Sequence, residues 1–575
     1  MKKLALPLFL LGLFVAPLAI RAFAKDEPAT PEAAVGMKSV AVLSIASYDE
    51  LMKDLAFLGE ISGTPGLDQQ LDAGLKMFTQ GQGLKGLDTT RPWGVTVQTD
   101  DVQFQPLVFL PVKSLKELLG SLGQLVGEPE DQGKGIMAIQ AGPQKVFAKE
   151  QTGWAFIGQT PESLATLPKD PAKILASLSA NYDIALRLNV QNVPEMYRSM
   201  AIDQVRAGVE QGMAQQPDED DETYSARKKV MEVQVDQMVT SINETKEVTL
   251  GWKIDREQKM TFVDLRLTAV PGGKLATQIA NLQDMPSDFS GFIDSDAAAS
   301  FNFVSKVPSQ DVEQALSQFE SVKMTVLKQV DNDEKIDDDE TKKALKSIIT
   351  DLFDSLITTM KAGKMDGGMS AMLGEKEMSL VAGVFVADPK KVEGSVKKLL
   401  EIAKKDPSFP DVKLDAVKHK GIRFHTMTVP IPPNEDVAKV LGEKLDVAIG
   451  FGAKHVYLAM GTDNIEKVKA GIDKSVSGLG KKYPPARLTL SMAQIMKFAA
   501  SVSPSPMAGL LADELSESEG KDHIIIAVRP PTSTDSAVSY RLTAEEGVLK
   551  LIGRASQLTG AKGDGNIEPP QKIEN

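Results

Sequence analysis

The chain has 575 residues, of which 42% are hydrophobic and 25% are charged, a balance typical of globular proteins and not of disordered or fibrous ones. It contains no cysteine, which excludes disulfides, thiolate metal sites, iron–sulfur clusters and a cysteine nucleophile. The net charge of -13 argues against a nucleic-acid-binding protein.

Residues 1–24 have the pattern of a secretory signal peptide. Two lysines precede a long apolar segment, which ends in the small-residue cleavage site Ala22-Phe23-Ala24. We expect cleavage after Ala24 and a secreted or periplasmic protein. The alternative is that the segment is kept as a membrane anchor. No later segment has a long charge-free apolar run, so we expect no transmembrane segment after cleavage.

The rest of the chain divides into a linker, two units and a tail. Residues 25–36 are polar and rich in Pro and Ala, and predict a linker; residues 556–575 predict a disordered tail. Between them we expect two homologous units, at 37–285 and 286–555.

The prediction of two units depends on short blocks that recur in the same order. The clearest is Arg-Leu-Thr-Ala, at 266–269 and again at 541–544. The other matches pair 134–136 with 420–422, the segment from Trp154 with that from His455, the segment from Ala185 with that from Ala486, and the region of Val40 with that of Ala299. Five matches in one order predict an internal duplication.

Strand and helix patterns are mixed in each half. Apolar residues at helical spacing predict helices over 342–361 and 224–243. Asp388-Pro389 has the residues of a helix start, and Asp49 is the expected N-cap of an earlier helix.

Near residue 260 the pattern has a period of two. There, Phe262, Asp264 and Arg266 alternate with Val263, Leu265 and Leu267, which predicts a sheet wetted on one face. The fold class is therefore α+β, with two units of mainly antiparallel sheet covered by amphipathic helices.

One glycine motif resembles a nucleotide-binding loop. Residues 81–86 read G-x-G-x-x-G, but a helix pattern precedes them and a strand pattern follows. A dinucleotide site needs the reverse order, because the amides that bind the pyrophosphate open a helix. We therefore expect a helix-to-strand loop and no cofactor.

Acidic clusters offer a weak calcium hypothesis. Asp331, Asp333, Asp337 and Asp339 lie close together, but Ile336 and Lys342 stand where an EF-hand needs Gly and Glu. We expect the cluster to cap the following helix. The run over 217–222 is expected to be a solvated loop.

Histidine chemistry is limited to the second half, where all four histidines lie. His419 and His425 could lie close together on a strand pair, but on one strand they would be about 20 Å apart, too far for one metal. His455 aligns with Trp154, which favours packing over catalysis. No metal-ligating residues are therefore predicted.

Catalytic signatures are also lacking. The S-x-x-K of Ser395 and Lys398 lies within a helical pattern, and we find no other nucleophile motif. Trp93, Trp154 and Trp252 are expected to pack in strands. We therefore predict no catalytic residue.

The whole mature chain resembles the large uncharacterised secreted proteins common in planctomycete-type bacteria. The similarity rests on the signal-like start and on two cysteine-free copies built around VFLPVKSLKELL and WAFIGQTPESLATLP. It implies a Gram-negative-type periplasm or envelope, and no activity or site residue.

Three functions follow as hypotheses. The first is a non-enzymatic secreted or periplasmic protein that acts by binding a protein or by envelope assembly. The second is a carrier of an apolar ligand, such as a lipid, in a groove between helices and sheets. The third is a hydrolase with dispersed carboxylates, which would need convergent acids with perturbed pKa values in a pocket.

Overall fold

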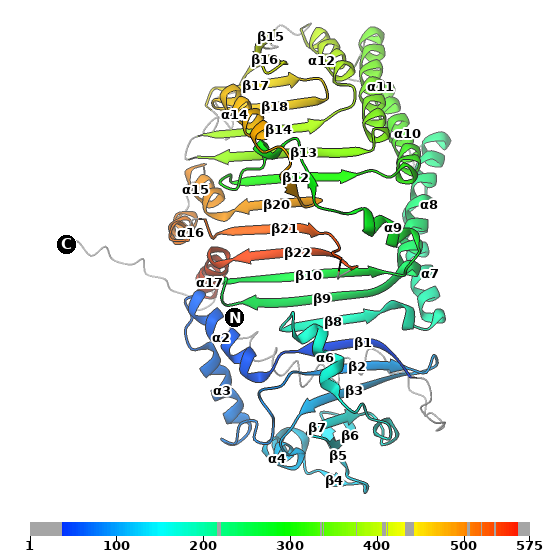
Figure 1. Ribbon diagram of the computed structural model, residues 1–575, viewed down its shortest axis with the longest axis vertical. Coiled ribbons are helices and arrows are strands. Elements are labelled where there is room, and N and C mark those ends of the chain that lie inside the picture. Colours follow the sequence, from blue (N-terminus) through cyan, green and yellow to red (C-terminus); the bar gives the residue numbers. More distant parts are fainter. Residues whose placement is uncertain are drawn as a thin grey trace, which may run out of the picture. The chain divides into compact units, whose positions relative to one another are not determined.

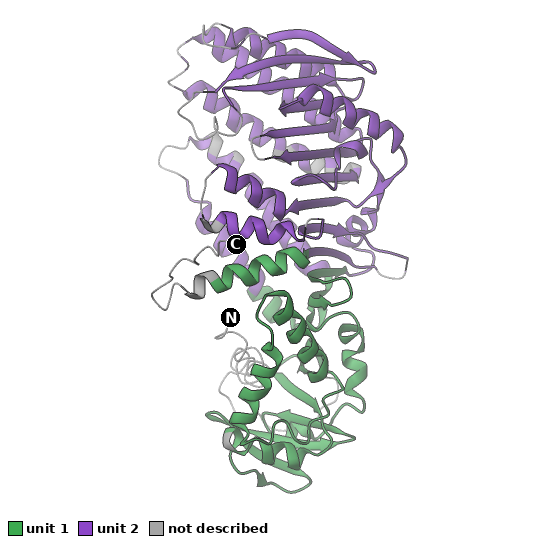
Figure 2. Cartoon of the chain, turned by 90° about the vertical axis from the view of Figure 1, so that its left-hand side faces the viewer, with its two compact units in different colours: residues 1–200, 245–268, 543–575 green, residues 201–244, 269–542 purple. Residues whose placement is uncertain are grey.

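The structure is a computed structural model that describes residues 37–215, 220–333, 336, 338–374, 377–404, 410, 412–431, 442–502, 506–518, 520–533 and 536–561. The predicted signal peptide and linker lie outside these residues. The chain forms two compact units (Figure 2): unit 1 is 1–200, 245–268 and 543–575, and unit 2 is 201–244 and 269–542. These units cross the boundary of the predicted repeats, because 201–244 joins unit 2 and 543–561 joins unit 1.

Unit 1 is built on an antiparallel sheet (Figure 1). Its strands are β1 (Lys38–Ile45), β2 (Trp93–Thr99), β3 (Phe104–Pro111), β4 (Glu130–Asp131), β5 (Ile136–Ala141), β6 (Gln144–Gln151), β7 (Trp154–Gly158), β8 (Ile184–Asn189), β9 (Thr245–Asp255) and β10 (Met260–Ala269). Strand β1 pairs with β2 and β8. From β2 the sheet continues through β3, β7, β6, β5 and β4, and from β8 it continues through β9 and β10.

The helices of unit 1 connect these strands. They are α2 (Tyr48–Ile61), α3 (Leu67–Phe78), α4 (Leu115–Ser121), α5 (Gly123–Val126), α6 (Pro171–Ser179) and α17 (Glu546–Ala561), with 3-10 turns η1 (Glu162–Leu164) and η2 (Val190–Asn192). The N-cap of α2 is Ser47, whose Oγ accepts the N–H of Glu50 at 3.2 Å. The predicted cap at Asp49 is therefore wrong; Asp49 lies in the first turn, where its charge suits the helix dipole. Because α17 runs to Ala561, the prediction that a tail begins at 556 is also wrong.

Both sides of the unit 1 sheet are covered at β2 and β3. Successive strand residues point to opposite sides. Val95 and Val108 therefore join one buried cluster with the leucines of α4, while Phe109 joins another with Leu175 and Leu178 of α6. These two clusters form the core of the unit.

The strands of unit 2 are antiparallel as well. They are β12 (Ala299–Lys306), β13 (Lys364–Leu373), β14 (Met378–Phe385), β15 (Val412–His419), β16 (Ile422–Pro430), β17 (Lys444–Phe451), β18 (His455–Gly461), β20 (Ala486–Ser491), β21 (His523–Arg529) and β22 (Val538–Glu545). Strand β12 pairs with β13 and β20. From β13 the sheet continues through β14, β18, β17, β16 and β15, and from β20 it continues through β21 and β22. A separate short pair joins β11 (Met285–Pro286) to β19 (Lys482–Tyr483).

The helices assigned to unit 2 include three from the first half of the chain. They are α7 (Glu195–Gly212), which starts in unit 1, α8 (Asp221–Glu244), α9 (Lys274–Asn281), α10 (Ser309–Asn332), α11 (Asp339–Lys361), α12 (Pro389–Ala403), α14 (Asn464–Ser477), α15 (Met492–Val502) and α16 (Pro506–Ser516), with the 3-10 turn η3 (Ser290–Phe292). Helices α8 and α11 confirm the predictions at 224–243 and 342–361. Asp388 caps α12 and Pro389 opens it, as predicted.

The core of unit 2 gathers aromatic rings beneath α14. Phe289, Phe292 and Tyr457 form one buried cluster with Val468 and Ile472 of this helix. The two units together confirm an α+β fold of mainly antiparallel sheet. Among the described residues, no helix combines the length and hydropathy needed to cross a membrane.

In strand β10, the structure shows which of the two alternating sets of residues faces the interior. Phe262 and Asp264 are buried, whereas Leu265 is 44% exposed. The reason is Tyr182, whose hydroxyl donates to the Asp264 carboxylate at 3.1 Å and whose ring meets Phe262 edge-on. The apolar set of β10 is therefore the set on the open side of the sheet.

Candidate functional site

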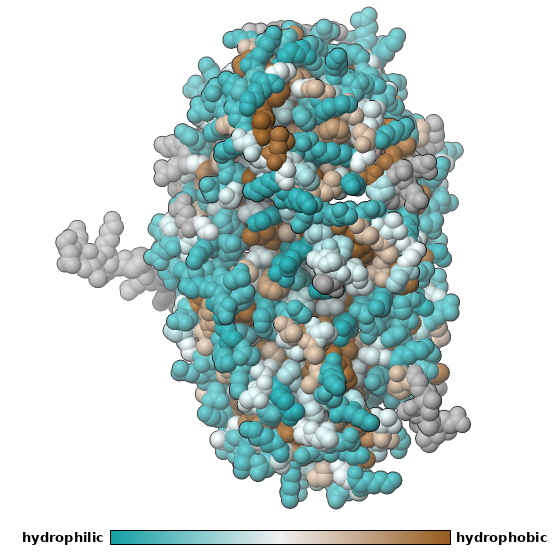
Figure 3. Space-filling model, in the orientation of Figure 1, coloured by the Kyte–Doolittle hydropathy of each residue, from teal (hydrophilic) through white to brown (hydrophobic). Residues whose placement is uncertain are grey.

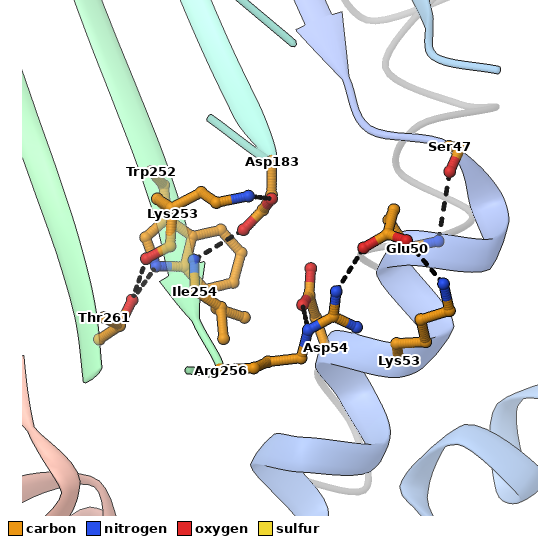
Figure 4. Close-up of polar contacts among 10 residues, drawn as sticks. All are labelled: Ser47, Glu50, Lys53, Asp54, Asp183, Trp252, Lys253, Ile254, Arg256 and Thr261. Carbon is orange, nitrogen blue, oxygen red and sulfur yellow. Dashed lines mark hydrogen bonds and ion pairs between the residues drawn. The ribbon is translucent and has the colours of Figure 1, made fainter. Parts of the chain in front are cut away.

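A cluster of charged side chains joins helix α2 to the end of strand β9 in unit 1 (Figure 4). Asp54 comes from α2, and Asp183 directly precedes β8. Lys253 Nζ lies 2.7 Å from Asp183 Oδ1, and the N–H of Ile254 donates to Asp183 Oδ2 at 2.6 Å. Arg256 Nε lies 3.4 Å from Asp54 Oδ1, and its guanidinium also binds Glu50. Two aspartates distant in sequence are thus held near two cations.

The two aspartates differ in how well they are satisfied. Both side chains are almost fully buried, but Asp54 Oδ2 has no hydrogen-bond partner. Burial, together with the negative charge of Asp183, raises the pKa of Asp54 to about 7, although Arg256 and Lys253 oppose this shift. Asp54 therefore exchanges a proton near neutral pH.

A catalytic carboxylate pair needs two acids that lie close together with a perturbed pKa, and it needs access to the reacting atom. This cluster meets only the first requirement. It has convergent acids and a perturbed pKa. However, the Asp54 and Asp183 side chains are only 5% and 4% exposed, and a general acid must reach the atom to which it gives its proton. The cluster therefore suits a structural link whose strength depends on pH better than it suits hydrolysis.

A second buried cluster surrounds His425 in unit 2. Its Nδ1 accepts the backbone N–H of Asp415 at 3.0 Å, and its Nε2 lies 3.3 Å from Glu393 Oε1. Asp415 stands at a positive φ of 52° within an irregular stretch of β15. Burial lowers the pKa of His425, although Glu393 and Asp415 oppose this shift. The neutral ring thus carries its proton on Nε2, facing Glu393.

The geometry of the His425 cluster does not fit a metal ion. Glu393, Asp415 and His425 have ligand atoms within 4.8 Å of one another. A metal on Nε2 would require the proton on Nδ1, where the Asp415 N–H already points. Lys397 and Arg423 also bind Glu393 at 2.7 and 2.5 Å, so its charge is already compensated. Glu393 and His425 are buried and Asp415 is exposed, and the three residues form a polar network around the His425 ring.

The structure places the other histidines that the sequence singled out. His455 packs edge-on against Phe289 at 5.3 Å, as the alignment with Trp154 predicts. His419 ends β15 and His425 lies in β16, because a turn at 420–421 separates them, so the two histidines stand on a strand pair, one of the two arrangements considered, and not on one strand.

The remaining motifs have structural roles. The glycine motif at 81–86 lies between α3 and β2, the helix-to-strand order predicted. Ser395 and Lys398 lie within α12, where Lys398 pairs with Asp351 at 2.8 Å. Trp252 donates to Thr261 Oγ1 at 2.7 Å on the neighbouring strand.

The acidic cluster near 331–339 caps α11, as predicted. Asp338 accepts the N–H groups of Glu340 and Thr341, and Asp331 pairs with Lys346 at 2.7 Å. Asp337 and residues 217–219 of the other acidic run lie outside the described residues.

The most unusual surface of unit 1 is an uncovered side of its sheet. Cross-strand pairs place Val95, Leu43, Leu186 and Leu250 in one row over β2, β1, β8 and β9. Val95 is buried with the leucines of α4, but Leu186 and Leu250 are 46% and 50% exposed. The helical cover therefore stops at β1, and the row continues into solvent.

Unit 2 has a similar row of apolar residues, which crosses its strands in the same way. Cross-strand pairs connect Met369, Phe301, Leu488 and Ile526 over β13, β12, β20 and β21. Ile526 is 48% exposed, and Tyr540 and Leu542 on β22 are 47% and 46% exposed. We call the exposed apolar surfaces of β8–β10 and of β20–β22 the open faces.

A groove between α7 and α8 does not suit an apolar ligand. Its volume is about 570 Å³. Charged residues dominate its lining, which includes Arg206, Glu210, Lys228, Glu232 and Asp236. The space-filling view likewise shows hydrophilic residues over most of the visible side, with apolar residues in separate areas (Figure 3).

Comparison with known protein families, with curated proteins and with solved structures finds no match.

The open faces have a signal in the sequence. The exposed apolar residues of β10 alternate with residues that pack against Tyr182, and the same holds for Leu250 on β9. No local sequence pattern predicts that Asp54 and Asp183 lie close together, because only the fold brings them together.

Proposed function

We propose that this protein acts outside the cytoplasm by binding, without bond-making chemistry, and that its open faces contact an apolar protein surface. The observation that carries the proposal is that a row of apolar residues crosses equivalent strands in each unit and leaves apolar side chains exposed in both. An exposed Leu is ordinary, but a contiguous uncovered apolar face marks a contact site.

Duplication makes this observation stronger. We propose that the chain arose from two copies of one unit. Strand pairings support this, because β1 to β10 pair in the same order as β12 to β18 and β20 to β22. Pro111 pairs with Trp154, and Phe385 pairs with His455, so the aligned residues Trp154 and His455 hold equivalent places.

The exposed positions then correspond between the copies. The shared Arg-Leu-Thr-Ala block aligns Leu265 with Tyr540, and the rows align Leu250 with Ile526. All four are between 44% and 50% exposed. Two copies that have diverged elsewhere retain large apolar side chains at these exposed positions, which favours a role in contact.

Location outside the cytoplasm rests on the signal-like residues 1–24. The mass of the protein recovered from its own cells tests this part. We expect a chain that starts at Lys25, and a full-length chain would contradict cleavage.

The binding role is tested with a photoreactive amino acid placed at Leu250 in cells. Light should join the protein to a defined partner, whereas the same amino acid at Val102, an exposed apolar loop residue of unit 1, should give no such product. If position 250 gives no product either, the open face of unit 1 is not a contact site.

A further inference from the structure

We infer that the partner of the open faces is a second copy of this chain, with each copy using both of its faces. This inference rests on the proposed function and names the partner. It is drawn from the area, the charge and the duplication of the faces.

The area of one face is too small for a stable complex. Three strands spaced about 4.8 Å apart, with about seven or eight residues each at about 3.3 Å per residue, cover about 350 Å². A stable protein interface covers about 800 Å² on each partner. Two faces together approach this value, so the partner must offer apolar surface to both.

Charge limits which surfaces can meet. The chain has a net charge of -13, so two copies repel each other over most of their surfaces. The open faces are the exception. On the open side of β8–β10 the alternating positions hold uncharged residues, apart from Lys246 near the start of β9: Leu186, Leu188, Val248, Leu250, Trp252, Thr261, Val263, Leu265 and Leu267.

The corresponding positions of unit 2 are also uncharged. They are Leu488, Leu490, Ile524, Ile526, Tyr540 and Leu542. Two neutral apolar faces are complementary to each other, and sheets pack face to face about 10 Å apart. A second copy is therefore a partner that brings two such faces, and a symmetric dimer repeats each contact.

Sedimentation velocity of the full-length mature chain tests this inference. The variants are Leu250→Asp in unit 1 and Ile526→Asp in unit 2. Their matched controls are Val102→Asp and Leu479→Asp, at apolar loop residues that are 70% and 67% exposed. Because all four side chains are exposed in the monomer, circular dichroism should show that every variant folds.

We expect the wild type and both controls to sediment as dimers. Each open-face variant should raise the dimer dissociation constant at least about tenfold, because it buries a charge in an apolar contact. A wild type that stays monomeric at its highest soluble concentration would overturn the inference. So would a dimer that is insensitive to either open-face variant.

The two proposals fail in different ways. If the wild type is monomeric but light joins position 250 to another protein, the contact role stands and the second copy is excluded. If position 250 gives no product and the dimer is insensitive to the open-face variants, both proposals are wrong.

Discussion

Asp54 provides the sharpest test of the structure, because its burial makes unit 1 sensitive to pH. Its pKa rises from an ordinary value of 3.8 to about 7. The folded protein therefore holds a proton that the unfolded chain releases at lower pH. The contribution of Asp54 to stability is complete below pH 3.8, falls as the pH rises, and is lost above about 7.

The magnitude follows from the two pKa values. Each pKa unit corresponds to about 1.4 kcal/mol. Between pH 5 and pH 8, the shift makes the Asp54 contribution to the free energy of unfolding fall by about 3 kcal/mol. Asp54→Asn resembles the protonated side chain and cannot ionise. Its stability relative to the wild type should therefore increase by about 3 kcal/mol between pH 5 and pH 8.

Urea unfolding followed by tryptophan fluorescence measures this difference. All three tryptophans, Trp93, Trp154 and Trp252, lie in unit 1, so the signal reports the unit that contains Asp54. Comparing the variant with the wild type at each pH cancels the titration of all other groups.

Glu257→Gln is the matched control, since this exposed acid directly follows Arg256. Its effect should be the same at both pH values. If Asp54→Asn also behaves the same at pH 5 and pH 8, Asp54 is not buried as described and the reasoning is refuted.

Three other predictions concern packing, capping and metal binding. Gly251→Ala should destabilise unit 1 by about 1–3 kcal/mol in urea unfolding, because the added Cβ would lie 2.5 Å from the Tyr182 ring; an unchanged midpoint would contradict this packing. Ser47→Ala should cost about 1 kcal/mol in the same assay, because it removes the N-cap of α2, and full stability would mean that another group caps the helix. Zinc or EDTA should leave the melting temperature unchanged, since the Asp415 N–H occupies His425 Nδ1; stabilisation by zinc that is lost in a His425→Gln variant would show that the ring binds metal after all.

The sequence determined those features that depend on neighbouring residues. Helix α11 follows from apolar residues at helical spacing, and the start of α12 follows from Asp388 and Pro389. The glycine motif at 81–86 is a loop because a helix precedes it and a strand follows. Each of these outcomes is decided within a few turns of chain, so a local pattern suffices.

Capping at Asp49 shows where local reasoning reaches its limit. Ser47 and Asp49 are both suitable N-cap residues. Which one caps the helix depends on where β1 ends, and that depends on the pairing of β1 with β2 and β8.

Tertiary structure alone decided the properties on which the proposals depend. The alternation in β10 indicated that one side would be wet, but Tyr182, which is 82 residues away, determined that Asp264 would be buried and Leu265 exposed. Likewise, Asp54 and Asp183 come close only when α2 packs beside the end of β9. Burial and pKa depend on neighbours in space, and a sequence shows only neighbours along the chain.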